Sequence, residues 1–216
     1  MESETKVSTN IVHIVRHGQN PANITREFSC RRVDYSLTPL GVVQARQTAA
    51  FFAGRPIAAL YASPLKRAKE TADILAEPLG LPVPVLEQFR EIDVGDLEGQ
   101  EPNDERWAFH DGIFERWFAG DPTARFPGGE CQHDVRARMR AGLRAVVSGR
   151  ADAEVIVVAH GGITLASIAD LCPEVDMAAL ASARNPNCAI TTLALASEGD
   201  DLRGRLIAWA ACDHLS

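Results

Sequence analysis

The amino-acid sequence predicts an α/β fold, a three-layer αβα sandwich whose mostly parallel central sheet carries helices on both faces. Strand-like and helix-like segments alternate along most of the chain, which is typical of such sheets. The clearest strand-like segments are almost continuously apolar, as strands buried on both faces are. With 216 residues, 46% of them hydrophobic, the chain can bury a core of this size. We expect one domain over residues 1–216.

The first third of the chain supplies three predicted strands and two helices. Residues 10–15 (NIVHIV) and 56–62 (PIAALYA) are apolar runs of strand length. Residues 38–54 place apolar side chains at helical spacing. Residues 63–80 begin with Ser-Pro, an N-cap followed by proline at the first helical position, and predict a second helix. Residues 83–86 (VPVL) predict a third short strand.

An acidic, irregular loop over residues 90–105 leads into the middle of the chain. Residues 103–119 can form a helix rich in aromatic side chains, and FPGGE at 126–130 breaks the chain. The next helix has one apolar face, formed by Val135, Met139, Gly142, Leu143 and Val146.

The last third begins with the strongest strand signal, residues 153–162 (AEVIVVAHGG), followed by a helix over 163–171. Two further strands are predicted at 188–196 and 204–210, joined by the polar turn 197–203. Nothing in the sequence indicates a repeat or a linker.

The charge balance argues against two classes of partner. The chain has 22 Lys and Arg against 29 Asp and Glu, a net charge of −7, whereas nucleic-acid and membrane-surface proteins need a basic face. Residues 1–10 lack the features of a secretory signal, and no apolar run is long enough to span a bilayer. Five scattered cysteines favour free thiols in a reducing compartment. We therefore expect a soluble cytoplasmic protein with no nucleic-acid or membrane partner.

Two of the predicted strands end in similar groups. HIVRHG places Arg16 and His17 at the carboxyl end of one strand, and IVVAHGG places His160 at the end of another. Ligands of such sheets bind beyond the carboxyl ends of the strands, so these side chains can face one crevice. Gly18 and Gly161 permit tight turns and close backbone approach to a ligand. Taken alone, a histidine at a strand end is more often structural.

Six segments, in this order, resemble the histidine phosphatase superfamily, the phosphoglycerate-mutase-like group. They are VRHGQ with Asn23 six residues after His17, DYSLTPLGVVQA, ASPLKRAKETA, REIDVGDLEG, FPGGE and VVAHGG. Together they span roughly residues 11–170. The resemblance implies a phosphoglycerate-mutase-like fold with a small helical cap inserted at roughly residues 97–127.

The resemblance also implies roles for single residues. His17 matches the nucleophile, which takes a phosphoryl group to form a phosphohistidine. Arg16, Arg67 and His160 match a cationic clamp around the phosphate, and Asn23 matches a further hydrogen-bond donor to it.

Glu91 matches the proton donor to the leaving oxygen, and Gln19 and Gly161 complete the residues expected to bind substrate. The residues alone leave the choice of Glu91 open, because the same acidic loop holds three more carboxylates that could serve. These are Asp93, Asp96 and Glu98.

Phosphoryl transfer needs an in-line nucleophile and compensation of the charge on the phosphoryl oxygens. Arginines suit this task because they bind phosphate oxygens bidentately and stay charged. We therefore expect no metal and no other cofactor. A metallohydrolase would have only His13 and His17 as closely spaced ligands, and His17 lies past the strand end.

Three functions compete. The favoured one is a metal-independent phosphatase that hydrolyses a small phosphorylated metabolite; the others are a phosphoglycerate-mutase-type transfer and a phosphate-binding regulator without turnover. A mutase must hold two anionic groups, whereas residues 100–126 contain six acidic residues and three arginines. The terminal strands offer an edge for a homodimer.

The predicted cap region is rich in aromatic side chains. They either form a pocket for an apolar or planar part of the substrate or pack the cap onto the body or a second subunit. The residues are Trp107, Phe109, Phe114, Trp117, Phe118 and Phe126.

Overall fold

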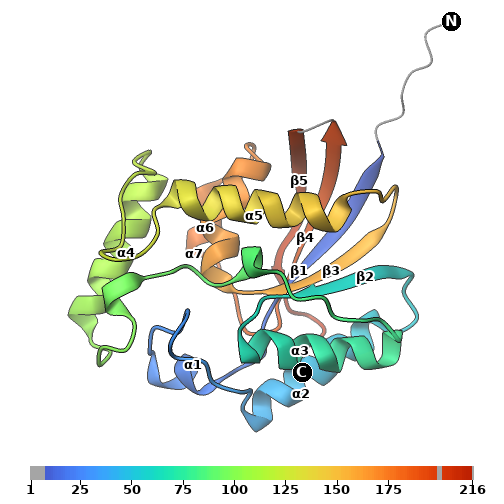
Figure 1. Ribbon diagram of the computed structural model, residues 1–216, viewed down its shortest axis with the longest axis horizontal. Coiled ribbons are helices and arrows are strands. Elements are labelled where there is room, and N and C mark those ends of the chain that lie inside the picture. The colour runs from blue at the N-terminus through green and yellow to red at the C-terminus, as the bar shows by residue number, and fades with distance from the viewer. Residues whose placement is uncertain (1–7, 199–200, 216) are drawn as a thin grey trace, which may run out of the picture.

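A computed structural model describes residues 8–198 and 201–215 and confirms the α/β fold with helices on both faces of a central sheet (Figure 1). The sheet order is β2-β3-β1-β4-β5. Its strands are β1 (Thr9–Arg16), β2 (Ile57–Ala62), β3 (Glu154–Ala159), β4 (Ile190–Glu198) and β5 (Asp201–Ala211). The pairs β1–β3 and β2–β3 are parallel, whereas β4 pairs antiparallel with both β1 and β5. The sheet is therefore mixed, with only β4 running in the opposite direction.

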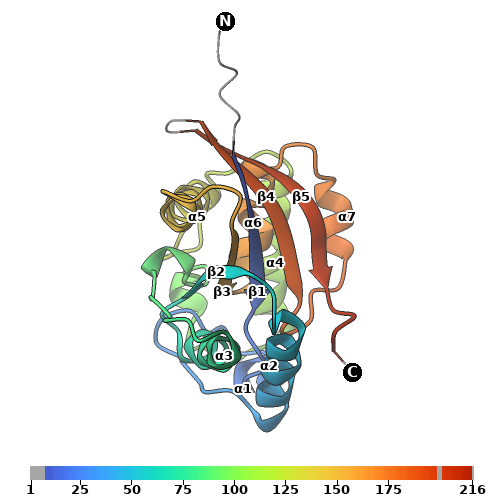
Figure 2. The ribbon, with the colours of Figure 1, turned by 90° about the vertical axis from the view of Figure 1, so that its right-hand side faces the viewer.

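The helices form the two outer layers and the cap. They are α1 (Pro21–Thr25), α2 (Pro39–Phe52), α3 (Lys66–Ala76), α4 (Asp104–Phe118), α5 (Gln132–Val147), α6 (Gly161–Leu171) and α7 (Met177–Ser182). Figures 1 and 2 show α2 and α3 next to each other on one side of the sheet. Helix α4, in the predicted cap region, lies apart from the sheet in Figure 1.

The central strands bury both of their faces. In β1, Val12 and Ile14 pack into the core that contains α5 and α6, whereas Val15 packs into the core that contains α2 and α3. In β3, Val157 belongs to the first core and Ile156 to the second, and both are fully buried. Because side chains alternate between faces, two cores require apolar residues at successive positions, which explains the continuous apolar runs.

Two predictions at β2 and α3 need correction. Residues 83–86 form no strand but a single parallel bridge between Val85 and Ala62. Prolines at 82 and 84 lack the N–H groups that a ladder needs. Helix α3 begins at Lys66 after Leu65, without a side-chain cap. The hydroxyl of Ser63, the expected cap, instead lies 2.6 Å from Nε2 of His160.

The short helices α1 and α7 were not predicted. A capping box between Asn20 and Asn23 closes the start of α1, and Asp176 caps α7. The predicted turn at 197–203 is shorter than expected because β4 and β5 extend into it, and residues 199–200 lie outside the described part. The signal-peptide prediction rests mainly on residues 1–7, which also lie outside it. No helix in the described ranges is both long and apolar enough to cross a membrane.

Candidate active site

The register of β1 and β3 brings the two strand ends together. Arg16 pairs with Ala159, so the residues that follow, His17 and His160, are neighbours. Their ring centroids lie 5.1 Å apart, and both side chains are buried. Gly18 turns the chain here, and a Cβ on it would come within 2.6 Å of the Gly41 carbonyl oxygen. The strand ends therefore meet as the sequence predicts.

Arg67, from the first turn of α3, joins the two histidines. Its Nε donates to Nε2 of His17 at 3.0 Å, and its Nη2 donates to Nδ1 of His160 at 3.2 Å. Further bonds run from its guanidinium to the hydroxyl and carbonyl of Ser29, at 3.0 and 2.8 Å. Arg67 is 3% exposed, so a nearly buried cation organises the site.

The hydrogen bonds assign the tautomers of both rings. Nδ1 of His17 lies 2.7 Å from the Gly18 carbonyl, which can only accept, so Nδ1 carries the proton. Nε2 of His17 therefore holds the lone pair that accepts from Arg67. Nδ1 of His160 accepts from Arg67 in the same way, which leaves its Nε2–H to donate to Ser63.

Burial and the neighbouring arginines keep the imidazoles neutral. Burial lowers the pKa of His17 well below its ordinary value, and the charges of Arg67 and Arg16 lower it further. The pKa of His160 falls well below the ordinary value for the same reasons, burial first and Arg67 second. A neutral His17 keeps a lone pair available for attack at physiological pH.

Arg16 leaves a donor unused beside the pocket. Its Nη1 donates to the Asn185 carbonyl, but its buried Nε has no hydrogen-bond partner among the described residues. A Cβ on Gly161 would lie 3.5 Å from this Nε and 3.4 Å from the amide nitrogen of Asn185. All three residues line a pocket of about 540 Å³ together with His17 and Arg67. A buried unpartnered N–H of a cation suits an anionic ligand.

Glu91 lies at the N-terminus of α6, on the wall of the same pocket. Its carboxylate accepts backbone N–H bonds from Gly162 at 3.1 Å and Ile163 at 2.8 Å, and one from Ile92 at 2.9 Å. These bonds fix the direction in which Glu91 faces the pocket.

The other carboxylates of the acidic loop are occupied elsewhere. One oxygen of Glu98 accepts from four successive backbone N–H groups, those of residues 30–33, at 2.7 to 3.2 Å. Asp93 pairs with Arg31 at 2.5 Å. Neither these residues nor Asp96 line the pocket. Of the four candidates that the sequence left open, only Glu91 reaches it.

Of the three residues predicted to bind substrate, two line the pocket and one does not. Asn23 and Gly161 line the pocket, but Gln19 does not. The Gln19 side chain accepts a hydrogen bond from the Thr38 hydroxyl at 2.9 Å and so joins the start of α2. The expectation that Gln19 binds substrate is therefore not supported.

The metal pair considered from the sequence does not form at the pocket. His13 contacts Thr192 at 3.1 Å and Glu154 at 3.2 Å on the sheet, and its ring packs on Phe52. Across residues 8–198 and 201–215, no cluster of three or more His, Cys, Asp or Glu is placed to hold a metal ion.

The aromatic residues of the cap divide between the pocket and the core. Trp107, Phe114 and Phe118 line the pocket, whereas Trp117 and Phe126 are buried in the core and attach α4 to the body. Phe109 lies away from this pocket and is 45% exposed.

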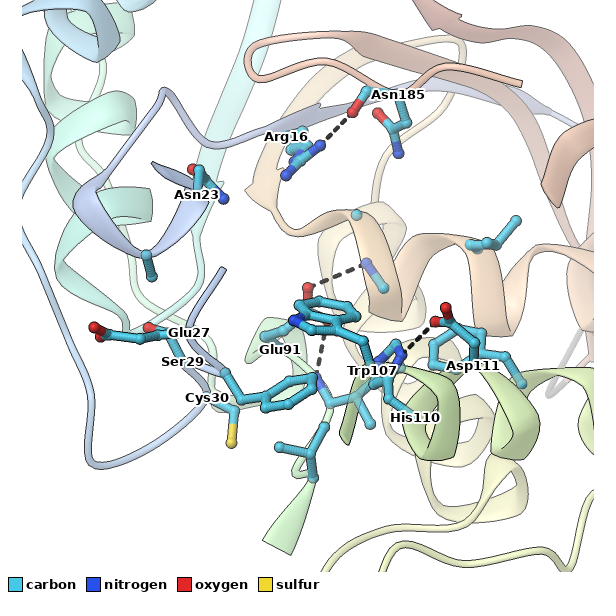
Figure 3. A pocket seen from close by; sticks show the side chains of 18 of the residues that line it. Arg16, Asn23, Glu27, Ser29, Cys30, Glu91, Trp107, His110, Asp111 and Asn185 are labelled. Atoms are coloured by element: carbon cyan, nitrogen blue, oxygen red, sulfur yellow. Dashed lines mark hydrogen bonds and ion pairs between the residues drawn. The ribbon is translucent and has the colours of Figure 1, made fainter. Parts of the chain in front are cut away.

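Several lining residues were missed from the sequence, because no motif marks them. Among them are Phe28, His110 and Asn185. Figure 3 shows Trp107, His110 and Asp111 together on α4, while Arg16 and Asn185 lie across the pocket from them.

Several known proteins are similar to this chain. The profile of the histidine phosphatase superfamily (branch 1) matches residues 12–206. The putative phosphoserine phosphatase 2 of Hydrogenobacter thermophilus is 31% identical over 194 residues, 88% of this chain and 92% of that protein. The probable phosphoglycerate mutase GpmB of Proteus mirabilis is 31% identical over 69% of each chain. The structure of a mycobacterial glucosyl-3-phosphoglycerate phosphatase is 32% identical, with a TM-score of 0.78 over 94% of this chain and 100% of that one.

Proposed function

Because the chain belongs to the histidine phosphatase superfamily (branch 1), we propose that it hydrolyses a small phosphomonoester through a phosphohistidine on His17, without a metal. The observation that carries this proposal is the hydrogen bond of 3.0 Å from Arg67 to Nε2 of His17. It supports a neutral imidazole whose lone pair lies beside a cation, at the bottom of a pocket of metabolite size.

In the first step, Nε2 of His17 attacks phosphorus as the bond from phosphorus to the ester oxygen breaks. Glu91, the pocket carboxyl group of the acidic loop, starts this step protonated and gives its proton to the leaving oxygen. In the second step, water attacks the phosphohistidine and Glu91 takes a proton from that water. The N–P bond breaks, inorganic phosphate leaves, and both groups return to their starting states.

The clamp compensates the charge on the phosphoryl oxygens. Arg67 cannot donate to Nε2 of His17 while that lone pair attacks, so its N–H groups turn to the phosphate. The unused Nε of Arg16 and the amide of Asn23 supply further donors. Each charge-assisted bond is worth roughly 1.5–3 kcal/mol, so several can supply much of the ~8 kcal/mol or more by which enzymes lower barriers.

Hydrolysis is favoured over mutase transfer by the charges along the pocket. Among the described residues that line it, Arg16 and Arg67 are the only arginines or lysines, and both lie at the clamp. A second anionic group, which a phosphoglycerate mutase must hold, would meet no further arginine or lysine there. We also propose that the region around residues 97–127 acts as a cap of the single domain, because α4 supplies one wall of the pocket.

Phosphoenzyme trapping tests the proposed function. The wild-type protein, mixed with ³²P-labelled substrate or ³²P-phosphate and quenched in alkali, should carry label that is stable to base and labile to acid. His17→Ala should carry none and should not hydrolyse p-nitrophenyl phosphate, whereas His133→Ala, which alters an exposed histidine, should behave as wild type.

Turnover should also survive EDTA. Hydrolysis by His17→Ala at a wild-type rate would refute the nucleophile, and activity that is lost to EDTA and restored by Mg²⁺ or Zn²⁺ would refute the metal-independent step.

A further inference from the structure

We infer that the leaving alcohol of the substrate is an apolar group that carries an amine, amide or hydroxyl donor and no carboxylate or second phosphate. This inference rests on the proposed function and concerns the wall of the pocket formed by residues 27–28 and by α4, which we name the cap end. The cap end comprises Glu27, Phe28, Trp107, His110, Asp111, Phe114, Glu115 and Phe118.

The ionisable side chains of the cap end, apart from His110, are acidic. They are Glu27, Asp111 and Glu115, and in the part of the chain that the structure describes no lysine or arginine lines the pocket beyond Arg16 and Arg67. Within the described residues, none of the three carboxylates forms an ion pair with a lysine or arginine, and the partner of Asp111 is His110. A carboxylate on the substrate would therefore enter a region of like charge, whereas an ammonium would meet opposite charge.

The N–H groups of the cap end are already engaged. The indole N–H of Trp107 donates to the Arg26 carbonyl at 3.0 Å. Nδ1 of His110 lies 2.9 Å from a carboxylate oxygen of Asp111, which can only accept, so Nδ1 carries the proton. Burial lowers the pKa of His110, although Asp111 opposes this effect, and the neutral ring presents the lone pair of Nε2. The cap end thus offers acceptors, which match an N–H or O–H donor on the substrate.

Aromatic rings provide the apolar surface between these acceptors. The ring centroids of His110 lie 5.4 Å from Phe28 and 4.8 Å from Phe114, and Phe114 lies 5.9 Å from Phe118. This continuous row of rings favours binding of an apolar part of the substrate, because contact with the rings buries apolar surface. It also favours binding of a cation, because the faces of aromatic rings attract positive charge.

The inferred substrate differs in charge from the substrates named for two relatives of this chain. Phosphoserine and glucosyl-3-phosphoglycerate, named in the descriptions of those proteins, each carry a carboxylate. A relationship at about 30% identity leaves room for this difference, and the residues of the cap end lie outside the six sequence segments that resemble the superfamily.

Three aryl phosphates of matched leaving group test the inference. They carry 4-(carboxymethyl), 4-(carbamoylmethyl) or 4-(2-aminoethyl) substituents, so the first two are isosteric and differ in charge. For the wild type, kcat/KM should be about 10-fold or more lower for the carboxymethyl ester than for the carbamoylmethyl ester. The aminoethyl ester should be at least as good as the carbamoylmethyl ester.

Variants on one helix locate the effect. Glu115→Gln should narrow the gap between the carboxymethyl and carbamoylmethyl esters, whereas Glu105→Gln should leave it unchanged. Both variants replace a glutamate of α4 by glutamine and therefore change the net charge equally. Glu105, however, lies outside this pocket, so it serves as the control. His110→Phe keeps a ring and removes the acceptor, and it should lower kcat/KM for the two donor-bearing esters more than for 4-ethylphenyl phosphate.

The outcomes distinguish the inference from the proposed function. Equal or faster hydrolysis of the carboxymethyl ester overturns the inference and leaves the proposed phosphatase intact. If no ester is hydrolysed, calorimetric binding of the three esters to His17→Ala decides. If the three esters bind in the expected order, the inference holds although the proposed function has failed. If they bind equally or not at all, the inference is overturned.

Discussion

Arg67 donates from Nε to Nε2 of His17 at 3.0 Å, and so its guanidinium covers the lone pair that the proposed reaction uses. The same guanidinium reaches Nδ1 of His160 at 3.2 Å. A phosphoryl group that enters the pocket must take over these N–H groups, which frees His17 for attack. The cation that protects the resting nucleophile is thus also expected to bind the phosphate.

Arg67→Lys should lower kcat/KM for p-nitrophenyl phosphate by about 100-fold or more, because an ammonium cannot reproduce the forked contacts with His17, His160 and Ser29. The measurement is steady-state kinetics with a thermal unfolding check. Arg46→Lys, at an exposed position, is the matched control and should retain full activity. Wild-type kinetics in Arg67→Lys would show that charge alone is sufficient.

Glu91→Gln should impair esters of poor leaving groups more than p-nitrophenyl phosphate, by about 100-fold in relative kcat, because only poor leaving groups need a proton. Comparing an alkyl phosphate with p-nitrophenyl phosphate measures this ratio. Asp93→Asn alters a carboxylate outside the pocket and should leave the ratio unchanged. If Asp93→Asn produced the larger change, the proton donor would be misassigned.

Stability should fall as the pH drops below about 6.5, the ordinary pKa of histidine. The folded pKa values of His17 and His160 lie well below this value, so in acid the unfolded chain binds protons that the folded chain does not. Each such histidine should contribute about 1.4 kcal/mol per pH unit to the decline. Urea unfolding between pH 5 and pH 7.5 measures the slope.

His160→Asn should make this slope shallower than that of the wild type, while His133→Asn, at an exposed site, should not. An unchanged slope in His160→Asn would mean that His160 takes up a proton in the folded protein as readily as in the unfolded chain.

Gly18→Ala should destabilise the fold by about 1–3 kcal/mol, because the new Cβ would meet the backbone of Gly41 at 2.6 Å and neither segment can easily move. Gly112→Ala is the matched control, since a Cβ there meets no atom within 4 Å and the site is helical. That control should be neutral or stabilised by up to about 1 kcal/mol. Urea unfolding of both variants tests the contrast, and equal stabilities would contradict it.

The sequence predicts the central strands and the meeting of His17 with His160 because both depend on local pattern. A strand buried on two faces must be apolar at successive positions, and parallel neighbours end at one edge. The short strand at 83–86 was predicted wrongly because its apolar residues outweighed Pro84 within it and Pro82 just before it. The Ser63 cap was predicted wrongly because its hydroxyl meets His160, 97 positions away, rather than α3.

The pocket wall beyond the motifs could not be predicted. Phe28, His110 and Asn185 come from three separate segments, and each reaches the pocket only through the packing of α1, α4 and the chain after α7. Their residue types alone do not distinguish a pocket-lining residue from one that packs in the core or faces solvent. Glu91 was assigned from the family resemblance, whereas its residue type alone did not distinguish it from the three other carboxylates; only the fold shows that it alone of the four lines the pocket.

One carboxylate oxygen of Glu98 accepts hydrogen bonds from four backbone N–H groups, those of residues 30–33. The loop therefore binds an anion that belongs to the same chain. Burial raises the pKa of Glu98, but these bonds lower it more, so the carboxylate stays charged at neutral pH. The loop is thereby preorganised, and with it Ser29, the residue just before it that holds Arg67. Substrate binding need not spend free energy on ordering this segment, which leaves more of the interaction with phosphate available as affinity.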